Sequence, residues 1–348
     1  MAKIPVDRLS ASAYGTHSFC PMKYFINYCL GHREDKFNLK REMGSVCHDV
    51  WEMVALSKLG HQEGKKHKIS KRYGRISTDY KNLDIEALID KVYAWYKENE
   101  PSAEWTDKVR AKISEWVYKI LDTEYDPRVL DVIQPEQYFN HTLEEDWAEY
   151  AQVVKGKVEN KRYRITGKID IVFQKPGEPD NIHVLDYKTG KRVDWNSDTT
   201  HTKELEHFMD DIQLQMYYYI VLKKFQEEGK KVWVVIHYTN HGGAYEIPFD
   251  PDDVDHILDK LRKKFEDITN NIPKQNRTWK CSKFCEYGKQ TFTDVGMPEL
   301  AMKSKGWKGD CHVSKEGEEC KMCEAVHLFL KSRPVDLVVE KCKKKKEK

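Results

Sequence analysis

The chain has no long apolar run, and its first residues do not resemble a secretory leader. No stretch of its 348 residues approaches the roughly 18 consecutive apolar residues that a membrane-spanning helix needs. Residues 1–7, MAKIPVD, also lack the apolar segment of a signal peptide. We therefore expect a cytoplasmic protein that does not act at a membrane.

The chain also has little net charge and lacks several common nucleotide-binding and DNA-binding motifs. Although 33% of its residues are charged, the formal net charge is only +2, so any attraction for nucleic acid must come from local patches. It contains no G-x-x-x-x-G-K-[ST] phosphate-binding loop, so we expect no motor activity. The absence of a helix-turn-helix or zinc-finger pattern argues against a protein that reads base sequence.

Cysteine, by contrast, is well represented, with nine residues in the chain. In a cytoplasmic protein these are better explained as metal ligands or buried thiols than as disulfides. The length is sufficient for one large domain with an appendage, or for two domains.

Hydrophobic periodicity predicts a helical first part followed by a sheet. Helical spacing runs through residues 10–59 and 85–125, and the polar, basic stretch 60–82 between them is predicted to be an exposed loop. Later segments are predicted, in chain order, as four strands, a long helix, two paired strands and a last helix: 134–142, 147–158, 163–174, 183–188, 204–228, 231–239, 245–249 and 251–270.

This order predicts an α/β fold with a central mixed sheet flanked by helices. We divide the chain into three parts. An N-terminal helical region, residues 1–130, carries Cys20 and His48; a core spans residues 131–275; and a cysteine-rich, metal-binding segment with a basic tail spans residues 276–348.

Two strands that carry acidic residues give the strongest chemical signal. They are GKIDIV, residues 167–172, and IHVLDYKTG, residues 182–190. Because side chains alternate along a strand, Asp186 and Lys188 point to the same face, where Asp170 on a neighbouring strand could meet them. Two carboxylates and a lysine suit a hard divalent cation with a base or charge-stabilising group beside it. That combination is the chemistry of phosphodiester hydrolysis.

Four motifs in this order resemble the PD-(D/E)xK nuclease superfamily. Residues 44–48, GSVCH, resemble its helical G-x-x-x-H motif, and residues 167–170, GKID, resemble its first acidic strand. Residues 186–190, DYKTG, resemble its D-x-K strand, and residues 213–219, QLQMYYY, contain its Q-x-x-x-Y motif in two registers. The resemblance covers about residues 10–285. It is specifically to the RecB-like exonuclease branch, which includes the RecB and AddB nuclease domains and CRISPR-associated RecB-like nucleases.

The resemblance implies a restriction-endonuclease-like core and a metal-dependent active site. Asp170 and Asp186 would bind Mg²⁺ or Mn²⁺, with His48 as a nitrogen ligand and the backbone carbonyl of Tyr187 as a further ligand. Lys188 would orient or deprotonate the attacking water, or neutralise developing charge.

The helix motif is implied to line the groove and to hold a phosphate or a base, through Gln213 or Gln215 together with Tyr217 or Tyr219. Each candidate also has an ordinary structural explanation, such as a strand-end surface residue, a partly buried histidine or an amphipathic helix. Glu52, one turn after His48, could lie behind the metal ligands or on a solvated helix face. The joint arrangement favours catalysis.

Members of this branch often carry an iron–sulfur cluster, and part of that pattern is present. Cys20 begins a C-P pair like the family's N-terminal one, and Cys281 and Cys285 resemble its C-terminal group with one extra residue between them. The next expected cysteine is absent, so the remaining ligand would come from Cys311, Cys320 or Cys323. We favour a [4Fe–4S] cluster. Structural zinc is the alternative, because four thiolates suit either, and His312 and His327 lie nearby in the sequence.

Basic residues gather in the predicted loop, where they are candidate phosphate contacts or ordinary solvated side chains: Lys65, Lys66, Lys68, Lys71, Arg72 and Arg75. The lysine-rich tail, residues 343–348, has the same two explanations. Tyr187 or Trp195, if exposed near the groove, could stack on unpaired bases.

We therefore interpret the chain as a standalone, metal-dependent DNA exonuclease that acts on single strands or duplex ends. The resemblance implies products with 5′-phosphate and 3′-hydroxyl ends, and a role in recombination, repair, phage replication or CRISPR adaptation, with partner proteins from such a pathway. The alternatives are a structure-specific or nicking endonuclease and a non-catalytic DNA-binding subunit.

Overall fold

The computed structural model describes residues 7–29, 38–67, 73–101, 104–154, 157–194 and 201–271. These residues form two compact units, each assembled from separate stretches of the chain. The first unit contains the described residues within 1–35, 140–166 and 254–348, and the second contains those within 36–139 and 167–253. His48 and both acidic strand motifs therefore belong to the second unit, whereas Cys20 belongs to the first.

The helices of the second unit are α3 (Leu39–Glu63), α4 (Ile85–Asn99), α5 (Asp107–Leu121), α6 (Leu205–Met209) and α7 (Ile212–Phe225), with 3₁₀ turns at Tyr80–Asn82 and Gln226–Glu228. Its strands are β2 (Asp131–Thr142), β5 (Arg164–Gln174), β6 (Asn181–Lys188), β7 (Val193–Asp194), β8 (His201–Thr202), β9 (Lys231–Tyr238) and β10 (Gly243–Ile247). The end of β2 and the start of β5 belong to the first unit.

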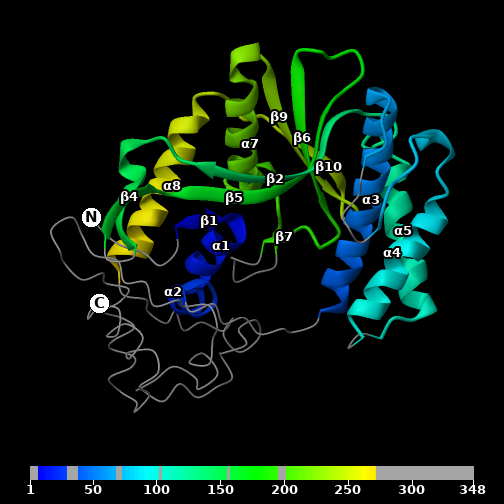
Figure 1. Ribbon diagram of the computed structural model, residues 1–348, viewed down its shortest axis with the longest axis horizontal. Helices are drawn as coiled ribbons and strands as arrows, with labels where there is room; N and C mark the ends of the chain where they lie inside the picture. The colour runs from blue at the N-terminus through cyan, green and yellow to red at the C-terminus, as the bar shows by residue number, and fades with distance from the viewer. Residues whose placement is uncertain are drawn as a thin grey trace. The chain divides into compact units, whose positions relative to one another are not determined.

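A mixed sheet forms the centre of the second unit (Figure 1). Its strands run in the order β5-β6-β9-β10, and β2 pairs with β5. β5 and β6 are antiparallel, β6 and β9 are parallel, and β9 and β10 are antiparallel. The parallel pair requires a crossover, which α6 and α7 supply between β6 and β9. The predicted α/β fold with a central mixed sheet is thus confirmed.

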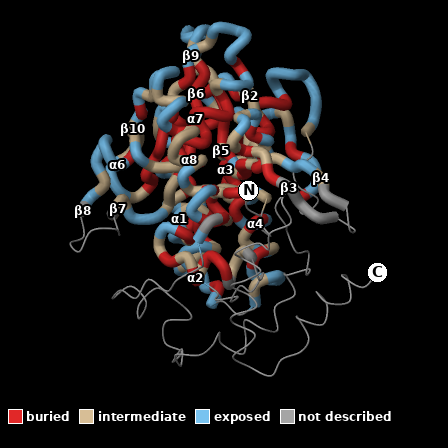
Figure 2. The backbone as a smooth tube through the Cα atoms, turned by 90° about the vertical axis from the view of Figure 1, so that its left-hand side faces the viewer, coloured by how far each residue is buried: buried red, intermediate tan, exposed pale blue. Residues whose placement is uncertain are grey.

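Helices cover this sheet because its strands are apolar on both faces. Ile171, Leu185 and Val235 share one buried core with apolar residues of α3, α4 and α5. Val184 and Val234, which alternate with them along β6 and β9, are also fully buried, and α7 packs against both strands. Figure 2 shows the buried stretches concentrated along β6, β9 and α7. A buried sheet of this kind gives the strand ends a rigid base.

The first unit is built from β1 (Arg8–Ser10), α1 (Ala11–Phe19), α2 (Pro21–Tyr24), a π-helical turn (Phe25–Cys29), a 3₁₀ turn (Asp146–Ala148), β3 (Glu149–Val154), β4 (Lys157–Arg162) and α8 (Asp253–Asn270). β1 runs parallel to the first residues of β5. Tyr163 stacks on Phe265 of α8 at a ring distance of 4.2 Å and on Tyr150 at 4.7 Å. These aromatic stacks join the hairpin to the last helix.

Three predicted elements are wrong in detail. The single strand predicted over residues 147–158 is a hairpin, in which β3 and β4 pair antiparallel with each other. The long helix predicted over 204–228 is two helices. The Asp211 side chain accepts a hydrogen bond from the backbone N–H of Gln213 and so caps the start of the second helix. The loop predicted from residue 60 begins later, since α3 continues to Glu63 and ends at Gly64 with φ 68°.

Among the described residues, no helix is both long enough and apolar enough to cross a membrane.

Candidate active site

The two acidic residues lie opposite each other on neighbouring strands. In the antiparallel pair β5–β6, Ile171 is paired with Leu185, which places Asp170 across from Asp186 at the next position. Asp186 is almost fully buried, with 2% of its surface exposed. Two carboxylates are thereby brought together in a place where water screens their charges poorly.

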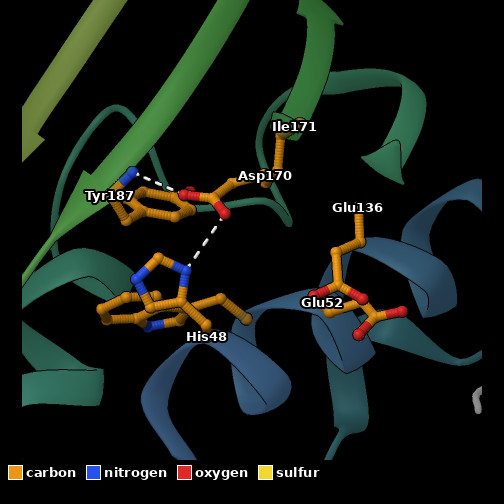
Figure 3. Close-up of a pocket in the computed structure, with 7 residues that line it drawn as sticks. His48, Glu52, Glu136, Asp170, Ile171 and Tyr187 are labelled. Carbon is orange, nitrogen blue, oxygen red and sulfur yellow. Dashed lines mark hydrogen bonds and ion pairs between the residues drawn. The ribbon is translucent and has the colours of Figure 1, made fainter. Parts of the chain in front are cut away.

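Helix α3 brings His48 to the same place. His48 Nδ1 lies 3.1 Å from Asp170 Oδ1, and Asp170 Oδ2 accepts a hydrogen bond of 2.8 Å from the backbone amide of Tyr187 (Figure 3). Both oxygens of Asp170 are therefore oriented, one by a helix and the other by the neighbouring strand.

Gly44, one turn before His48, explains how α3 comes so close to the end of β6. A Cβ atom at Gly44 would stand 2.7 Å from Oγ1 of Thr189, the residue after Lys188. Such a distance is too short for a Cβ atom unless the Thr189 side chain shifts, so glycine favours this close approach. The glycine of the G-x-x-x-H motif thus has a packing role.

Lys188 completes a chain of polar contacts that leads into α7. Its Nζ lies 2.6 Å from Asp186 Oδ2 and donates to Gln213 Oε1 at 3.1 Å. The amide of Gln213 donates in turn to Asp186 Oδ1 at 3.2 Å and to the hydroxyl of Tyr217 at 2.6 Å. The Tyr217 hydroxyl donates to the backbone carbonyl of Lys168 on β5. One glutamine therefore contacts both the carboxylate and the lysine of the D-x-K strand.

The charges of this cluster control one another. Burial raises the pKa of Asp186 to about 6, although Lys188 opposes the rise. Burial also disfavours the charged forms of Asp170 and His48, but their attraction outweighs it, so the pKa of Asp170 is lowered and that of His48 is raised. The pKa of Lys188 is raised by Asp186 in the same way, against the effect of burial. Lys188 is accordingly held as a cation.

A second group of carboxylates lies beside the first. Oxygen atoms of Asp49, Glu52 and Glu136 all lie within 4.8 Å of one another. Glu52 and Glu136 line the same small pocket as His48 and Asp170 (Figure 3). Glu136 also pairs with Lys168, and its φ of 41° is the one positive value at a non-glycine residue in the described chain.

Comparison with known proteins decides the family. The sequence matches the family described as the PD-(D/E)XK nuclease superfamily over residues 8–290, which is most of the chain. The chain belongs to this superfamily. Its function is therefore that of a nuclease.

Other comparisons are more distant, and no curated protein matches this nuclease. One similar solved structure comes from Eubacterium rectale and is described as a "Putative exonuclease", with a TM-score of 0.44, 14% identity, and coverage of 86% of this chain and 94% of that chain. Another is the crystal structure of SSO0001, with a TM-score of 0.23, 16% identity, and coverage of 56% and 77%. Neither likeness is close enough to bear on the substrate of the nuclease.

Nucleases of this superfamily use divalent metal ions, and the donors in this chain fit such an ion. Asp170 and Asp186 offer hard oxygen atoms, and His48 offers an imidazole nitrogen on the same side. Asp49, Glu52 and Glu136 form a second set of oxygen donors. Sequence reasoning missed Glu136, for which the only signal was the proline before it, an unusual residue inside a predicted strand.

The structure separates the two registers of the glutamine motif. Gln213 and Tyr217 contact the acidic cluster, whereas the Gln215 amide donates to the Met209 carbonyl at 2.7 Å and is buried inside α6–α7. Tyr219 is fully buried in α7 with the Lys223 ammonium over its ring. The geometry thus brings Gln213 to the candidate site, and Gln215 and Tyr219 to the core.

Tyr187 is not an exposed stacking residue. It is 1% exposed, and its hydroxyl donates to the Tyr125 carbonyl at 2.7 Å, so its ring is not available to stack on a base. Trp195, the other aromatic considered for this role, lies outside the described residues.

The remaining predicted contacts are only partly within the described chain. Cys20 is buried where α1 ends and α2 begins. In the basic stretch, Lys65 pairs with Glu63 at 2.7 Å, and Lys66 and Arg75 are exposed. The other predicted cysteine ligands and basic residues lie outside the described residues: Cys281, Cys285, Cys311, Cys320, Cys323, Lys68, Lys71 and Arg72.

Proposed function

We propose that this nuclease is a RecB-like, metal-dependent DNA exonuclease that acts on single strands or duplex ends. The observation that carries the proposal is the joint placement of two groups of contacts. His48 contacts Asp170, and Gln213 links Lys188 to Asp186 on the adjacent strand. Ion pairs with only a structural role would need one partner for each acid. Here a histidine, a lysine and an amide surround two facing carboxylates, which is more than charge balance requires and supports an active site.

Asp170, Asp186 and His48 would hold the catalytic Mg²⁺ or Mn²⁺, with the Tyr187 carbonyl as a further candidate ligand. When bound, the ion lowers the pKa of a coordinated water and stabilises negative charge on the phosphate. Because Asp186 has a pKa of about 6 before an ion is bound, its carboxylate is available as a ligand at neutral pH.

Lys188 acts on the phosphate as a cation. Its raised pKa keeps it protonated, so it donates hydrogen bonds and neutralises the charge that develops on the phosphate oxygens as water attacks phosphorus. Gln213 holds the Lys188 ammonium from one side and the Asp186 carboxylate from the other. Tyr217 fixes Gln213 by binding both its amide and the β5 backbone.

Hydrolysis breaks the bond between phosphorus and the 3′ oxygen. The attacking water loses one proton and becomes part of the new 5′-phosphate, and the departing 3′ oxygen gains a proton to become a hydroxyl. Recombination, repair, phage replication and CRISPR adaptation are pathways that need such an enzyme, together with partner proteins. Basic side chains such as Lys66 and Arg75, which are exposed, would contact the DNA backbone.

The cysteine-bound metal forms a separate part of the proposal. Cys20 would join Cys281, Cys285 and one of the later cysteines around a [4Fe–4S] cluster, with zinc as the alternative. Anaerobically purified protein should then be brown and absorb at about 400 nm, as thiolate-bound iron does. Colourless protein with stoichiometric zinc would reject the cluster and leave the nuclease proposal intact.

The test of the proposed function compares linear and circular single-stranded DNA in Mg²⁺, Mn²⁺ or EDTA. We expect degradation of the linear strand only, lost in EDTA and in Lys188→Ala. Cutting of the circle would show an endonuclease instead. Intact DNA binding without cleavage, in protein that retains its cysteine-bound metal, would show a non-catalytic subunit.

Lys112→Ala is the matched control for Lys188→Ala. Lys112 also pairs with a carboxylate, Glu115, at 2.6 Å, but it lies on α5 with 46% of its side chain exposed. Its loss should leave cleavage unchanged, because an exposed ion pair contributes little to stability.

A further inference from the structure

Tyr138 on β2 is an exposed aromatic side chain two residues after Glu136, which lines the pocket with His48 and Asp170. Three large apolar side chains are exposed in the described chain, and Tyr138, with 63% of its surface accessible, is the aromatic one among them. A single exposed apolar residue is ordinary on a protein surface, so only its position relative to the active site can indicate a function. The location is given by its neighbours on β2.

The residues on either side fix the direction of the Tyr138 side chain. Phe139 is buried against Gly167 and packs edge-on to Tyr217 of α7 at a ring distance of 6.0 Å. Because side chains alternate along a strand, Tyr138 projects from the opposite face of β2. Glu136, two residues earlier, has its carboxylate beside Glu52 of α3 and lines the pocket with His48 and Asp170.

Two contacts show which way β2 runs along α3. The backbone of Val132 exchanges two hydrogen bonds with the Gln62 side chain, at 3.0 and 3.1 Å. Four residues further along β2, Glu136 lies beside Glu52, ten residues earlier on α3. The strand therefore advances toward the N-terminal half of the helix, where His48 lies, and Tyr138 continues in that direction. Two residues span at most about 7 Å, so its backbone is close to Glu136.

We propose that Tyr138 is a stacking platform for an unpaired base next to the scissile phosphate, so that DNA occupies the active site as a single strand. This inference rests on the proposed function and specifies its substrate. An aromatic ring near the acidic pocket offers what the carboxylates cannot, namely affinity for the neutral face of a base. Tyr187 cannot serve in this way, because it is buried and bound to Tyr125.

Stacking on a base predicts a particular kinetic signature. Tyr138→Ala should raise KM for single-stranded DNA by about fivefold to tenfold, which corresponds to the lower end of measured stacking energies. It should change kcat by less than about twofold, because the ring touches neither the scissile phosphate nor its ligands. Tyr138→Phe should keep the wild-type KM, since it retains the ring and removes only the hydroxyl. Val129→Ala, at a residue that is 52% exposed on the same unit, is the matched control.

A second measurement does not depend on cleavage. Single-stranded DNA carrying 2-aminopurine is titrated with each protein in EDTA, and quenching of its fluorescence reports stacking on an aromatic ring. We expect quenching with wild type, Tyr138→Phe and Val129→Ala, and its loss with Tyr138→Ala.

The outcomes separate this inference from the proposed function. If wild type degrades linear DNA and Tyr138→Ala matches it in both KM and quenching, the stacking role is rejected and the nuclease proposal stands. If wild type cleaves no DNA, the proposed function fails, and the quenching of 2-aminopurine still decides whether Tyr138 binds a base.

Discussion

The side-chain amide of Gln213 accepts a hydrogen bond of 3.1 Å from Lys188 through its oxygen and donates one to Asp186 through its nitrogen. The side chain therefore couples the position of the lysine to that of the carboxylate. Gln215, two residues later on the same helix, donates instead to the Met209 carbonyl. The two glutamines provide a direct comparison between a positioning role and a structural one.

Gln213→Ala should lower kcat by about 100-fold, because a small displacement of a catalytic group is sufficient for a loss of that size. Steady-state cleavage of linear single-stranded DNA measures the effect. Gln215→Ala should leave kcat near the wild-type value while lowering the free energy of unfolding by about 1 kcal/mol through loss of a buried hydrogen bond. Equal kcat values in the two variants would contradict the positioning role of Gln213.

Gly44→Ala should weaken metal binding and cleavage together. The new methyl group would stand 2.7 Å from Thr189 Oγ1, so either the Thr189 side chain shifts or α3 separates from the end of β6. We expect the separation, which would move His48 with the helix. Overpacking of this kind costs about 1–3 kcal/mol of stability. Thermal unfolding and Mn²⁺ titration measure both effects.

Thr189→Ala provides the control for Gly44→Ala, because it removes the clashing oxygen. The double variant should recover most of the lost stability and metal affinity, since the next atom, Thr189 Cβ, is 3.8 Å from the position of the added methyl group. A double variant as defective as Gly44→Ala alone would show that the glycine matters for another reason.

The sequence predicts the part of this site that depends on local geometry. Asp186 and Lys188 share a strand face by alternation. Asp170 could be expected to lie near them because its strand is joined to theirs by one short turn. Glu136 could not be predicted in the same way. Its position beside Glu52 depends on the register of β2 along α3, and on a positive φ that no residue other than glycine commonly adopts.

The sequence alone also could not predict which of the two glutamines contacts the acidic residues. A Q-x-x-x-Y pattern in two registers places Gln213 and Gln215 on different faces of one helix, and periodicity alone does not say which face meets the strands. The Asp211 cap starts α7 immediately before Gln213 and directs its first turn toward Asp186. Helix starts are among the least predictable features of a sequence, so this information came only with the fold.

Binding of Mn²⁺ should raise the melting temperature, because an ion that binds only the folded chain stabilises it. Asp186→Asn should abolish this increase if the ion is held by Asp170, Asp186 and His48. Glu52→Gln should preserve it, since Glu52 belongs to the neighbouring group with Asp49 and Glu136. Thermal unfolding with and without Mn²⁺ distinguishes the two positions, and loss of the increase in Glu52→Gln alone would place the ion in the second group.

His17 should make the protein less stable in mild acid. It is 5% exposed, and burial together with the nearby Lys264 ammonium, 3.5 Å away, lowers its pKa to about 4, although Asp267 opposes the shift. Because this value lies below the unfolded value of 6.5, the unfolded chain binds more protons between about pH 4 and 6.5. The free energy of unfolding therefore falls as pH is lowered through that window, by about 2 kcal/mol from this residue at pH 5.

His17→Phe should remove this part of the pH dependence. Phenylalanine keeps an aromatic ring edge-on to Tyr24, at the 5.2 Å separation of the native pair, but it cannot take up a proton. Urea unfolding at pH 7.5 and pH 5 measures the loss of stability in each protein, and the difference between the two losses isolates His17 from the other titrating groups. We expect the variant to lose about 2 kcal/mol less than wild type. Equal losses would mean that His17 is protonated in the folded state at pH 5, and that its contact with Lys264 does not suppress its charge.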